Sequence, residues 1–525
     1  MKAPRSKEDR TVRRIGIAAV AGILFLFAAL ATPAFGADTA TIVGSVRDSA
    51  GAAVPNATVT VSSPERGFTR NFVTDSSGAY VARGLLIGNY TVAAQASGFA
   101  RVVRTGITLT VGQTQRVDFQ LNVGKITQVV TVSGNIPRVQ TETGEVSQLI
   151  TSTQIQNLTV NGRDFMTLFA LTPGAANPNG LNPIQVGTGS GSENGTPFNG
   201  VRAESVNMEL DGADVSDTGD GGNGGKVSPP MDTIAEMRIT TSNYGADSGQ
   251  RGGAQIQIVT KSGTEKFHGN AHEFVRNNAL DANDWFLNRR INPPGGNAPA
   301  QPLKWNIFGF NIGGPLYIPG HYNTSRSKTF FFWSEEWARY RQGSVISANV
   351  PSARMRTGDF SECDPSSPNK SAIIISQGCA VPKNPLTGQP FAGDIVPINQ
   401  NGADLLNALF PLPNNGVDGY VTAPSLPTNW RDDTIRIDQN ISDKTSAFFR
   451  VTNESWTSTA APSLFSSSAY DTVVTPRNIP SQAATFHVVH TFNPTLTNEF
   501  IAGFSNSEIS YLPAVGPSSV AGSIN

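Results

Sequence analysis

The second half of this chain alternates short amphipathic segments with connections of two very different lengths. The connections alternate between long and short along the chain. The longest is 342–431, and the shortest is the two-residue turn Ser442-Asp443. Transmembrane barrels combine strands of about 9–11 residues with long loops on one side and short turns on the other. The pattern therefore predicts an antiparallel membrane barrel over residues 263–525, with lipid on its outer face. The seven expected strands are 267–276, 305–316, 328–340, 432–441, 444–456, 482–492 and 496–507.

The two faces of these strands separate well. A lipid-facing Arg at mid-bilayer costs about 2–4 kcal/mol, so Arg450 must face the interior. Glu273, Glu335 and Glu336 do not fit a simple alternation. Aromatic residues near strand ends predict interface girdles, and these are Trp305, Trp333, Trp337, Tyr340 and Trp456. Seven strands are fewer than the eight of the smallest closed barrel, so we expect an incomplete barrel and a piece of a longer protein.

The first 36 residues predict an export signal. Basic residues precede the apolar run 15–31, and Ala34-Phe35-Gly36 offers small residues for cleavage. An uncleaved membrane anchor is the alternative, although the run is short for a span of about 20 residues. Lys plus Arg number 39 and Asp plus Glu number 40, a net charge of −1 that disfavours nucleic acid as a partner.

Residues 37–122 contain short strand patterns every 8–12 residues with Gly or Asp at the turns, which predicts a β-sandwich. In one of these strands Ala57, Val59 and Val61 share a face. The segment resembles the carboxypeptidase-regulatory-like domain, a transthyretin-like module. The motifs are Gly44-x-Val46-x-Asp48-x-x-Gly51, Pro55-x-Ala57-x-Val59, Asp75-x-x-Gly78-x-Tyr80, Leu86-x-x-Gly-x-Tyr90 and Gly98-Phe99. The resemblance leaves carbohydrate binding open, beside a purely structural role.

Residues 123–262 combine short helix and strand patterns with two Gly-rich segments, 187–200 and 211–225. The motifs, in order, are Gln154-Ile155-Gln156-Asn157-Leu158, Asn161-Gly162-Arg163, Leu171-Thr172-Pro173-Gly174, Asn199-Gly200-x-Arg202, Leu210-Asp211-Gly212, Asn243-Tyr244-x-Ala246 and Thr260-Lys261-Ser262-Gly263-Thr264. They resemble the plug domain of TonB-dependent outer-membrane receptors, in particular the Oar-like branch. The resemblance implies a mainly β chain: signal peptide, sandwich, mixed α/β plug and the first strands of a transmembrane barrel.

The same resemblance implies a partner and a place for it. In that family a short extended segment before the plug adds as a strand to the periplasmic TonB-type coupling protein. The matching run here is Thr127, Gln128, Val129, Val130, Thr131 and Val132. Strand addition works through backbone hydrogen bonds and tolerates varied side chains, so an ordinary linker strand is an equal alternative. For ligand contact we expect the plug loops, with Asn199, Arg202, Asp211 and Asp214, on flexible solvated segments.

Few residues carry enzyme chemistry. His268 and His272 share a strand face, and the sequence places no third ligand beside them, so we expect polar interior residues and no metal site. Cys363 and Cys379 lie in the longest loop of an exported chain, which predicts a local disulfide. We therefore predict no catalytic residues and no cofactor.

The resulting prediction is an outer-membrane receptor of a Gram-negative bacterium with a periplasmic sandwich. It would import a scarce or large ligand (siderophore, glycan, peptide or protein) by energy-coupled gating of the plug. An outer-membrane adhesin or scaffold that displays its loops is the alternative, and a secreted hydrolase is a third, weaker one. The sequence does not identify the ligand.

Overall fold

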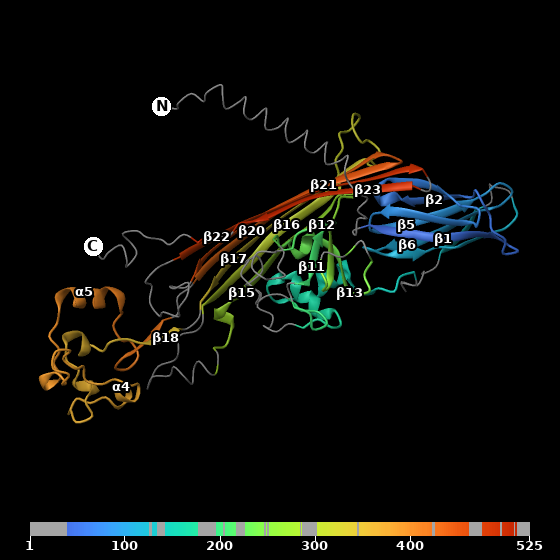
Figure 1. Ribbon diagram of the computed structural model, residues 1–525. Helices are drawn as coiled ribbons and strands as arrows, with labels where there is room; N and C mark the ends of the chain where they lie inside the picture. Colours follow the sequence, from blue (N-terminus) through green and yellow to red (C-terminus); the bar gives the residue numbers. More distant parts are fainter. Residues whose placement is uncertain are drawn as a thin grey trace, which may run out of the picture.

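The structure is a computed structural model. It describes residues 39–124, 129–133, 142–176, 196–202, 205–216, 226–245, 248, 251–283, 285, 302–343, 346–422, 426–460, 475–493, 496–508 and 510–511. The predicted signal peptide lies outside these residues. A β-sandwich stands at one end of a large curved sheet, and a small mixed α/β unit, the plug, lies on the concave side of that sheet (Figure 1). Among the described residues, none of the helices has the length and apolarity needed to span a membrane.

The sandwich pairs two sheets around one apolar core. Its strands are β1 (Ala40–Asp48), β2 (Thr58–Ser63), β3 (Phe68–Val73), β4 (Ala79–Leu85), β5 (Gly88–Gln95), β6 (Arg101–Leu109), β7 (Thr114–Arg116) and β8 (Phe119–Leu121), with the 3-10 helix η1 (Pro64–Arg66). One sheet has the order β4-β1-β7, with β8 also on β1, and the other begins β3-β2-β5-β6. The predicted face of Ala57, Val59 and Val61 is fully buried in the core, which confirms the period-two reading.

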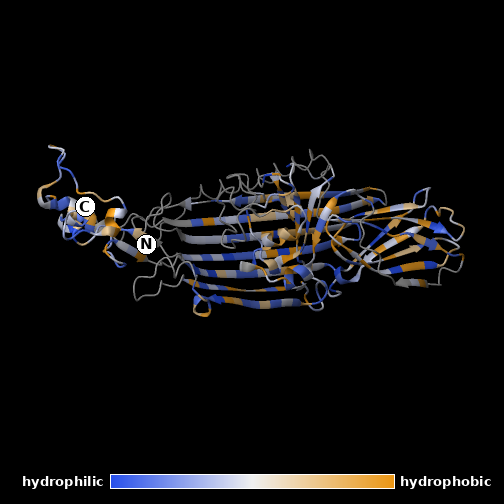
Figure 2. Cartoon of the chain, turned by 90° about the horizontal axis from the view of Figure 1, so that it is seen from below, coloured by the Kyte–Doolittle hydropathy of each residue, from blue (hydrophilic) through white to orange (hydrophobic). Residues whose placement is uncertain are grey.

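The plug is a five-stranded sheet with short helices. Its elements are β10 (Val146–Ile150), α2 (Ser152–Asn157), η2 (Asn161–Arg163), η3 (Phe165–Leu171), β11 (Asn207–Leu210), β12 (Ala213–Asp214), η5 (Met231–Thr233), β13 (Ile234–Ser242) and β14 (Gln255–Thr260). The strand order is β10-β13-β14-β11-β12. Nearly all of its apolar core comes from the plug itself, with Ala483 of the large sheet added. In Figure 2 hydrophobic residues gather in the plug and the sandwich.

The large sheet is antiparallel throughout. Its strands are β15 (His268–Asn277), β16 (Leu303–Pro315), β17 (Thr329–Gln342), β20 (Leu426–Ser442), β21 (Thr445–Ala460), β22 (Thr475–Asn493), β23 (Leu496–Ser507) and β24 (Ser510–Tyr511). The 3-10 helix η6 (Asn278–Leu280) follows β15 directly. They pair in sequence order, and within the described residues β15 and β23 do not pair with each other. The sheet is therefore open, as predicted for an incomplete barrel.

The predicted strand boundaries are too short at the long-loop end. The strands β20, β21 and β22 contain 17, 16 and 19 residues, against 10, 13 and 11 expected from 432–441, 444–456 and 482–492. The prediction used the length of a tilted membrane strand, about 9–11 residues. These strands continue beyond that length because their backbone ladders remain paired, as in Thr428↔Ser458.

The outer face of the large sheet changes from apolar to polar between two adjacent cross-strand rows. One row is apolar and contains Ile312, Trp333, Ile435, Val451, Ala484 and Phe504. The next row toward the long loops is polar from β17 onward and contains Glu335, Asp433, Asn453, Gln482 and Asn506. Glu335 therefore belongs to the polar rim, paired with Arg431 at 2.5 Å, while its neighbour Glu336 points inward. This resolves the irregularity that the sequence presented at these two residues.

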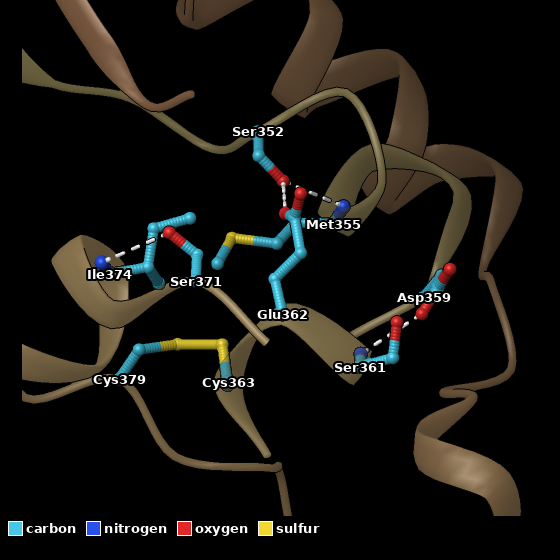
Figure 3. Close-up of a disulfide and its surroundings, with 9 residues drawn as sticks. All are labelled: Ser352, Met355, Asp359, Ser361, Glu362, Cys363, Ser371, Ile374 and Cys379. Carbon is cyan, nitrogen blue, oxygen red and sulfur yellow. Dashed lines mark hydrogen bonds between the residues drawn. A yellow bond between two sulfur atoms is a disulfide. The ribbon is translucent and has the colours of Figure 1, made fainter. Parts of the chain in front are cut away.

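The longest loop forms its own small unit at the end of the sheet opposite the sandwich (Figure 1). Its elements are β18 (Ile346–Asn349), η7 (Met355–Thr357), η8 (Ser361–Cys363), α4 (Ala372–Ser376), η9 (Ala392–Asp394), α5 (Gln400–Leu409) and β19 (Gly419–Thr422). Cys363 and Cys379 form a disulfide that ties η8 to the end of α4 (Figure 3). Beside it, the carboxylate of Glu362 is buried and accepts a hydrogen bond from Ser352.

The sandwich contacts the short-turn end of the large sheet. Arg70 donates to Ser446 Oγ at 3.1 Å and to Thr491 Oγ1 at 3.4 Å. Thr39 donates to Glu499 at 3.2 Å, and the Asn440 amide donates to the carbonyl of Arg66 at 2.7 Å. The N-terminal domain therefore lies on the side of the short turns, and the long loops lie on the other side.

Candidate functional site

The plug is held on the concave face of the sheet by a buried ion network centred on Asp211. Asp211 and Gly212 form the two-residue turn between β11 and β12, and both have positive φ, 51° and 76°. Asp-Gly is the typical sequence of such a turn. The turn directs the Asp211 carboxylate at the wall, where Oδ2 lies 2.7 Å from Arg450 Nε and Oδ1 lies 3.1 Å from Arg436 Nη1. All three side chains are at most 2% exposed.

Each side chain in this network has hydrogen-bond partners, and Arg450 Nε meets Asp211 as an ion pair only. Asp211 also accepts the amide of Thr260 at 2.9 Å and its hydroxyl at 2.8 Å. Arg436 holds Asp438 through two nitrogens, and Arg450 donates to Thr485 Oγ1 at 2.6 Å. Burying charges costs several kcal/mol per ion unless they are paired and hydrogen-bonded, and here that condition is met. The predicted inward orientation of Arg450 is confirmed.

A second ionic cluster joins the plug to β15 and β17. His272 places Nδ1 at 3.1 Å from Asp232 of the plug and Nε2 at 2.9 Å from Glu336. Arg163 of the plug lies 2.5 Å from Asp232 and stacks over the ring of Phe274 at 4.3 Å. The expectation that His272 lacks neighbouring ligand groups is wrong, because the fold brings Asp232 and Glu336 within 4.8 Å of it. The Arg163 guanidinium occupies part of this cluster and pairs with both Asp232 and Glu336, so the contact is ionic.

An aromatic cavity of about 60 Å³ lies on the long-loop side of these contacts. Trp305, Tyr340, Trp430 and Trp456 line it from the sheet, and Pro229 and Pro230 line it from the plug. The ring centroids of Trp305 and Tyr340 are 4.8 Å apart in an edge-to-face arrangement. The prediction that Trp305, Tyr340 and Trp456 form a lipid girdle is wrong, because each is at most 9% exposed and faces inward. Trp333, 40% exposed, and Trp337 do face outward.

Carboxyl groups lie around this cavity. Glu336 and Asp164 belong to its lining. Asp164 caps η3 by accepting the Met166 N–H at 2.8 Å. Burial raises the pKa of this plug carboxyl to about 7, and the Met166 N–H acts in the opposite direction. Asp432 and Glu454 follow Glu336 in the same inward row of the sheet.

The four residues expected to contact ligand are not brought together. Asp211 is fully buried, so the prediction of a solvated ligand contact is wrong for this residue. Asp214 is exposed and its carboxylate accepts the Ser216 N–H at 2.8 Å. Asn199 and Arg202 are exposed, and Asn199 donates to the carbonyl of Thr241. Thr241 is the last residue but one of β13 and lies seven residues from Ile234, so it is about 23 Å from the cavity-side end of that strand.

The segment expected to contact the coupling protein is only partly described, since Thr127 and Gln128 lie outside the described residues. The remainder forms β9 (Val129–Ser133), which pairs in parallel with β6 from Arg101↔Val129 to Thr105↔Ser133. It thereby becomes the fifth strand of the sandwich sheet. β9 is the edge strand of this sheet, and among the described strands none pairs with its second backbone edge.

Trp430 was not predicted as a site residue because β20 begins six residues before the expected strand. The expected strand began at residue 432, so Trp430 fell in a loop. Every second residue of a strand lies on the same face, and Arg436 faces inward. Continuing this alternation through Thr434 and Asp432 places Trp430 on the inward face as well. Asp232 and Arg163 could not have been found this way, because only the plug's tertiary placement brings them to the wall.

Comparisons with known proteins agree with this architecture. Residues 259–524 match the outer membrane beta barrel domain family, and residues 41–122 match the carboxypeptidase regulatory-like domain. The first match covers more than half of the 525 residues. The chain belongs to the outer membrane β-barrel family, and it is located in the outer membrane of a Gram-negative bacterium.

Within that class, the chain is similar to the TonB-dependent transporter Oar of Myxococcus xanthus, with 25% identity over 353 residues. The match covers 65% of this chain and 30% of the relative, so the chain spans less than a third of that relative's length. The predicted resemblance to Oar-like TonB-dependent receptors is therefore confirmed.

Two solved structures also show partial similarity to this chain. One is the outer membrane transporter YddB of Escherichia coli, with 9% identity, a TM-score of 0.42, and coverage of 68% of this chain and 38% of that one. The other is the siderophore receptor PirA of Acinetobacter baumannii, with 11% identity, a TM-score of 0.34, and coverage of 70% and 44%.

Proposed function

We propose that this chain is part of a TonB-dependent importer whose plug moves as a unit when a periplasmic coupling protein pulls on it. The observation that carries the proposal is the contrast between the plug's two kinds of contact. Its interior is an almost self-contained apolar core, whereas the groups that hold it to the wall include buried ion pairs. Water can solvate ionic groups when such a contact opens, so the plug can separate from the wall without exposing its core.

Release of the plug is ligand-controlled in this proposal. The aromatic cavity contains residues of both the plug and the sheet, so a ligand bound there touches both bodies. Such a ligand changes their relative free energy only if it binds the seated and displaced plug differently. The chemistry is binding and gating, with no covalent bond made or broken.

The coupling segment in this proposal is residues 127–132. Its described part, β9, pairs with the sandwich through the backbone, the same kind of contact that a strand-adding partner uses. The coupling protein would bind the uncovered edge of β9 or replace β6 as its neighbour.

The test is photo-crosslinking in living cells. A photoreactive residue at Thr131 should crosslink to the coupling protein, whereas one at exposed Thr69 on β3 should not. Growth of a knockout on defined iron, glycan and peptide sources then identifies the ligand class. Absence of the Thr131 crosslink, together with growth equal to wild type on every source, would favour the adhesin or scaffold alternative.

A further inference from the structure

The inner wall carries three carboxylates directly opposite one another on neighbouring strands. Glu336 of β17 pairs in register with Asp432 of β20, and Asp432 pairs with Glu454 of β21. They are 3%, 0% and 2% exposed. Directly opposed side chains have Cβ atoms about 4.5–5.5 Å apart, and like charges at that distance destabilise a sheet. This acidic row therefore requires either protonation or a cation.

The same wall shows how such a conflict is resolved one site away. Arg436 and Arg450 also lie directly opposite each other, four residues along the strand from the acidic row. The plug supplies Asp211 to this basic pair. Among the described residues, the ion pairs of the acidic row lie at its Glu336 end, where the plug supplies Arg163. Arg163 and His272 contact Glu336, and Glu454 accepts neutral donors, Trp430 Nε1 at 2.6 Å and the Ser228 N–H at 2.8 Å.

At the centre of the row, only one of the two carboxylate oxygens of Asp432 has a hydrogen-bond partner among the described residues. Its Oδ1 accepts the Thr434 hydroxyl at 3.0 Å. Its Oδ2 is buried and has no hydrogen-bond partner in the described part of the chain. A buried carboxylate oxygen without a partner costs free energy, and a nearby positive charge would offset that cost.

The aromatic cavity lies beside this row. Trp430 and Trp456 are cross-strand partners, and each is two residues from Asp432 and Glu454, respectively, on the same face. Residues two apart on a strand are separated by about 7 Å. Glu336 and its plug partner Arg163 both contribute to the cavity lining, so the charge at this end of the row is already paired. Aromatic faces attract cations, most strongly where water is excluded, so rings and carboxylates favour the same sign of charge.

We propose that the aromatic cavity binds a cationic head group, an ammonium or guanidinium, of the ligand. The proposal rests on the import function proposed above and specifies its ligand class. The positive charge would contact Trp430 and Trp456 and interact with the acidic row through the low-dielectric wall. The cavity is small, so in this proposal one head group enters it and the rest of the ligand lies toward the long loops.

The test measures binding of small probes to the purified receptor by tryptophan fluorescence. Butylammonium and butylguanidinium are the cationic probes, and N-butylacetamide is the uncharged match. Asp432→Asn should weaken binding of the cations about tenfold. Asp433→Asn, the adjacent residue on the outer face, is the matched control and should leave binding unchanged.

A second variant guards against a folding defect. Trp456→Leu should weaken cation binding while the heat-modifiable mobility of the folded receptor persists. Equal binding of N-butylacetamide and the cations, or cation binding unaffected by both Asp432→Asn and Trp456→Leu, would overturn the proposal. Crosslinking at Thr131 in these variants separates the two ideas, because import coupling that persists without a cation preference refutes only the ligand class.

Discussion

Arg436 and Arg450 lie directly opposite each other on β20 and β21, and the plug residue Asp211 lies between them within 3.1 Å of both. Two buried guanidinium groups in register repel each other, so the wall is complete only when the plug is in place. Residues of both bodies therefore fix the position of the plug: the wall contributes the basic pair, and the plug contributes the acidic turn.

Replacing Asp211 with Asn should loosen the plug. The change leaves Arg450 buried without its counter-charge, for which about 3–5 kcal/mol of destabilisation is typical. Hydrogen exchange at Asn207–Leu210 should accelerate strongly. The exposed Asp214→Asn variant, three residues away, should shift exchange by no more than about 0.5 kcal/mol. Equal exchange in both variants would contradict a role for the ion network.

Gly503 should tolerate no side chain. A Cβ at this position would lie 2.5 Å from the Cβ of Ala213 in the plug strand β12. Gly503→Ala should therefore destabilise the seated plug by about 1–3 kcal/mol, as overpacking generally does. Protease sensitivity of the plug is the measurement. Gly252→Ala, where nothing lies within 4 Å, is the control, and Gly503→Ala combined with Ala213→Gly should restore resistance.

Removing the disulfide should affect the long loop alone. In the chain-entropy model a closed loop of about this size contributes roughly 3 kcal/mol, so Cys363→Ser with Cys379→Ser should increase proteolysis within residues 350–418. The heat-modifiable mobility of the sheet should not change, because the bond joins two elements of the same loop. Loss of that mobility would show that the loop supports the strands.

The turn at Asp75 should weaken in acid. Hydrogen bonds from the Ser77 hydroxyl and then the Ala79 N–H lower the pKa of Asp75, since both favour the ionised carboxylate. The stabilisation is present above the ordinary carboxyl pKa of about 3.9 and is lost as pH falls through the lowered value. Protection factors at residues 75–79, which correct exchange rates for their intrinsic pH dependence, should fall between pH 6 and pH 3, and Asp75→Asn should flatten this dependence.

Much of the fold could be predicted because it depends on local periodicity. The alternation of Ile435 and Ile437 with Arg436 identifies the lipid face from the sequence alone, and β23 begins and ends where expected. The inward tryptophans were misassigned because aromatic residues suit a lipid interface and a buried cavity equally well. The alternation that places Arg450 inward also places Trp456 inward, and the girdle prediction did not apply this pattern to the tryptophans.

The site could be predicted far less well. Asp211 looked like one of several acidic residues in a Gly-rich loop, and nothing in the sequence indicates that Arg450, over two hundred residues later, lies beside it. Asp232 and His272 likewise belong to different bodies. Contacts between a plug and its wall are set by how two folded units fit, and single-sequence patterns carry no information about that fit.

The parallel pairing of β9 with β6 has a mechanical consequence. Hydrogen bonds between the two strands run across the chain direction, so a force applied along β9 loads all of them at once, whereas a force applied sideways breaks them one after another. Separating β9 from β6 would therefore need a large force along the strand and a small force perpendicular to it. If the coupling protein pulls on β9 as proposed, the direction of the force, and not only its strength, sets when this strand leaves the sandwich.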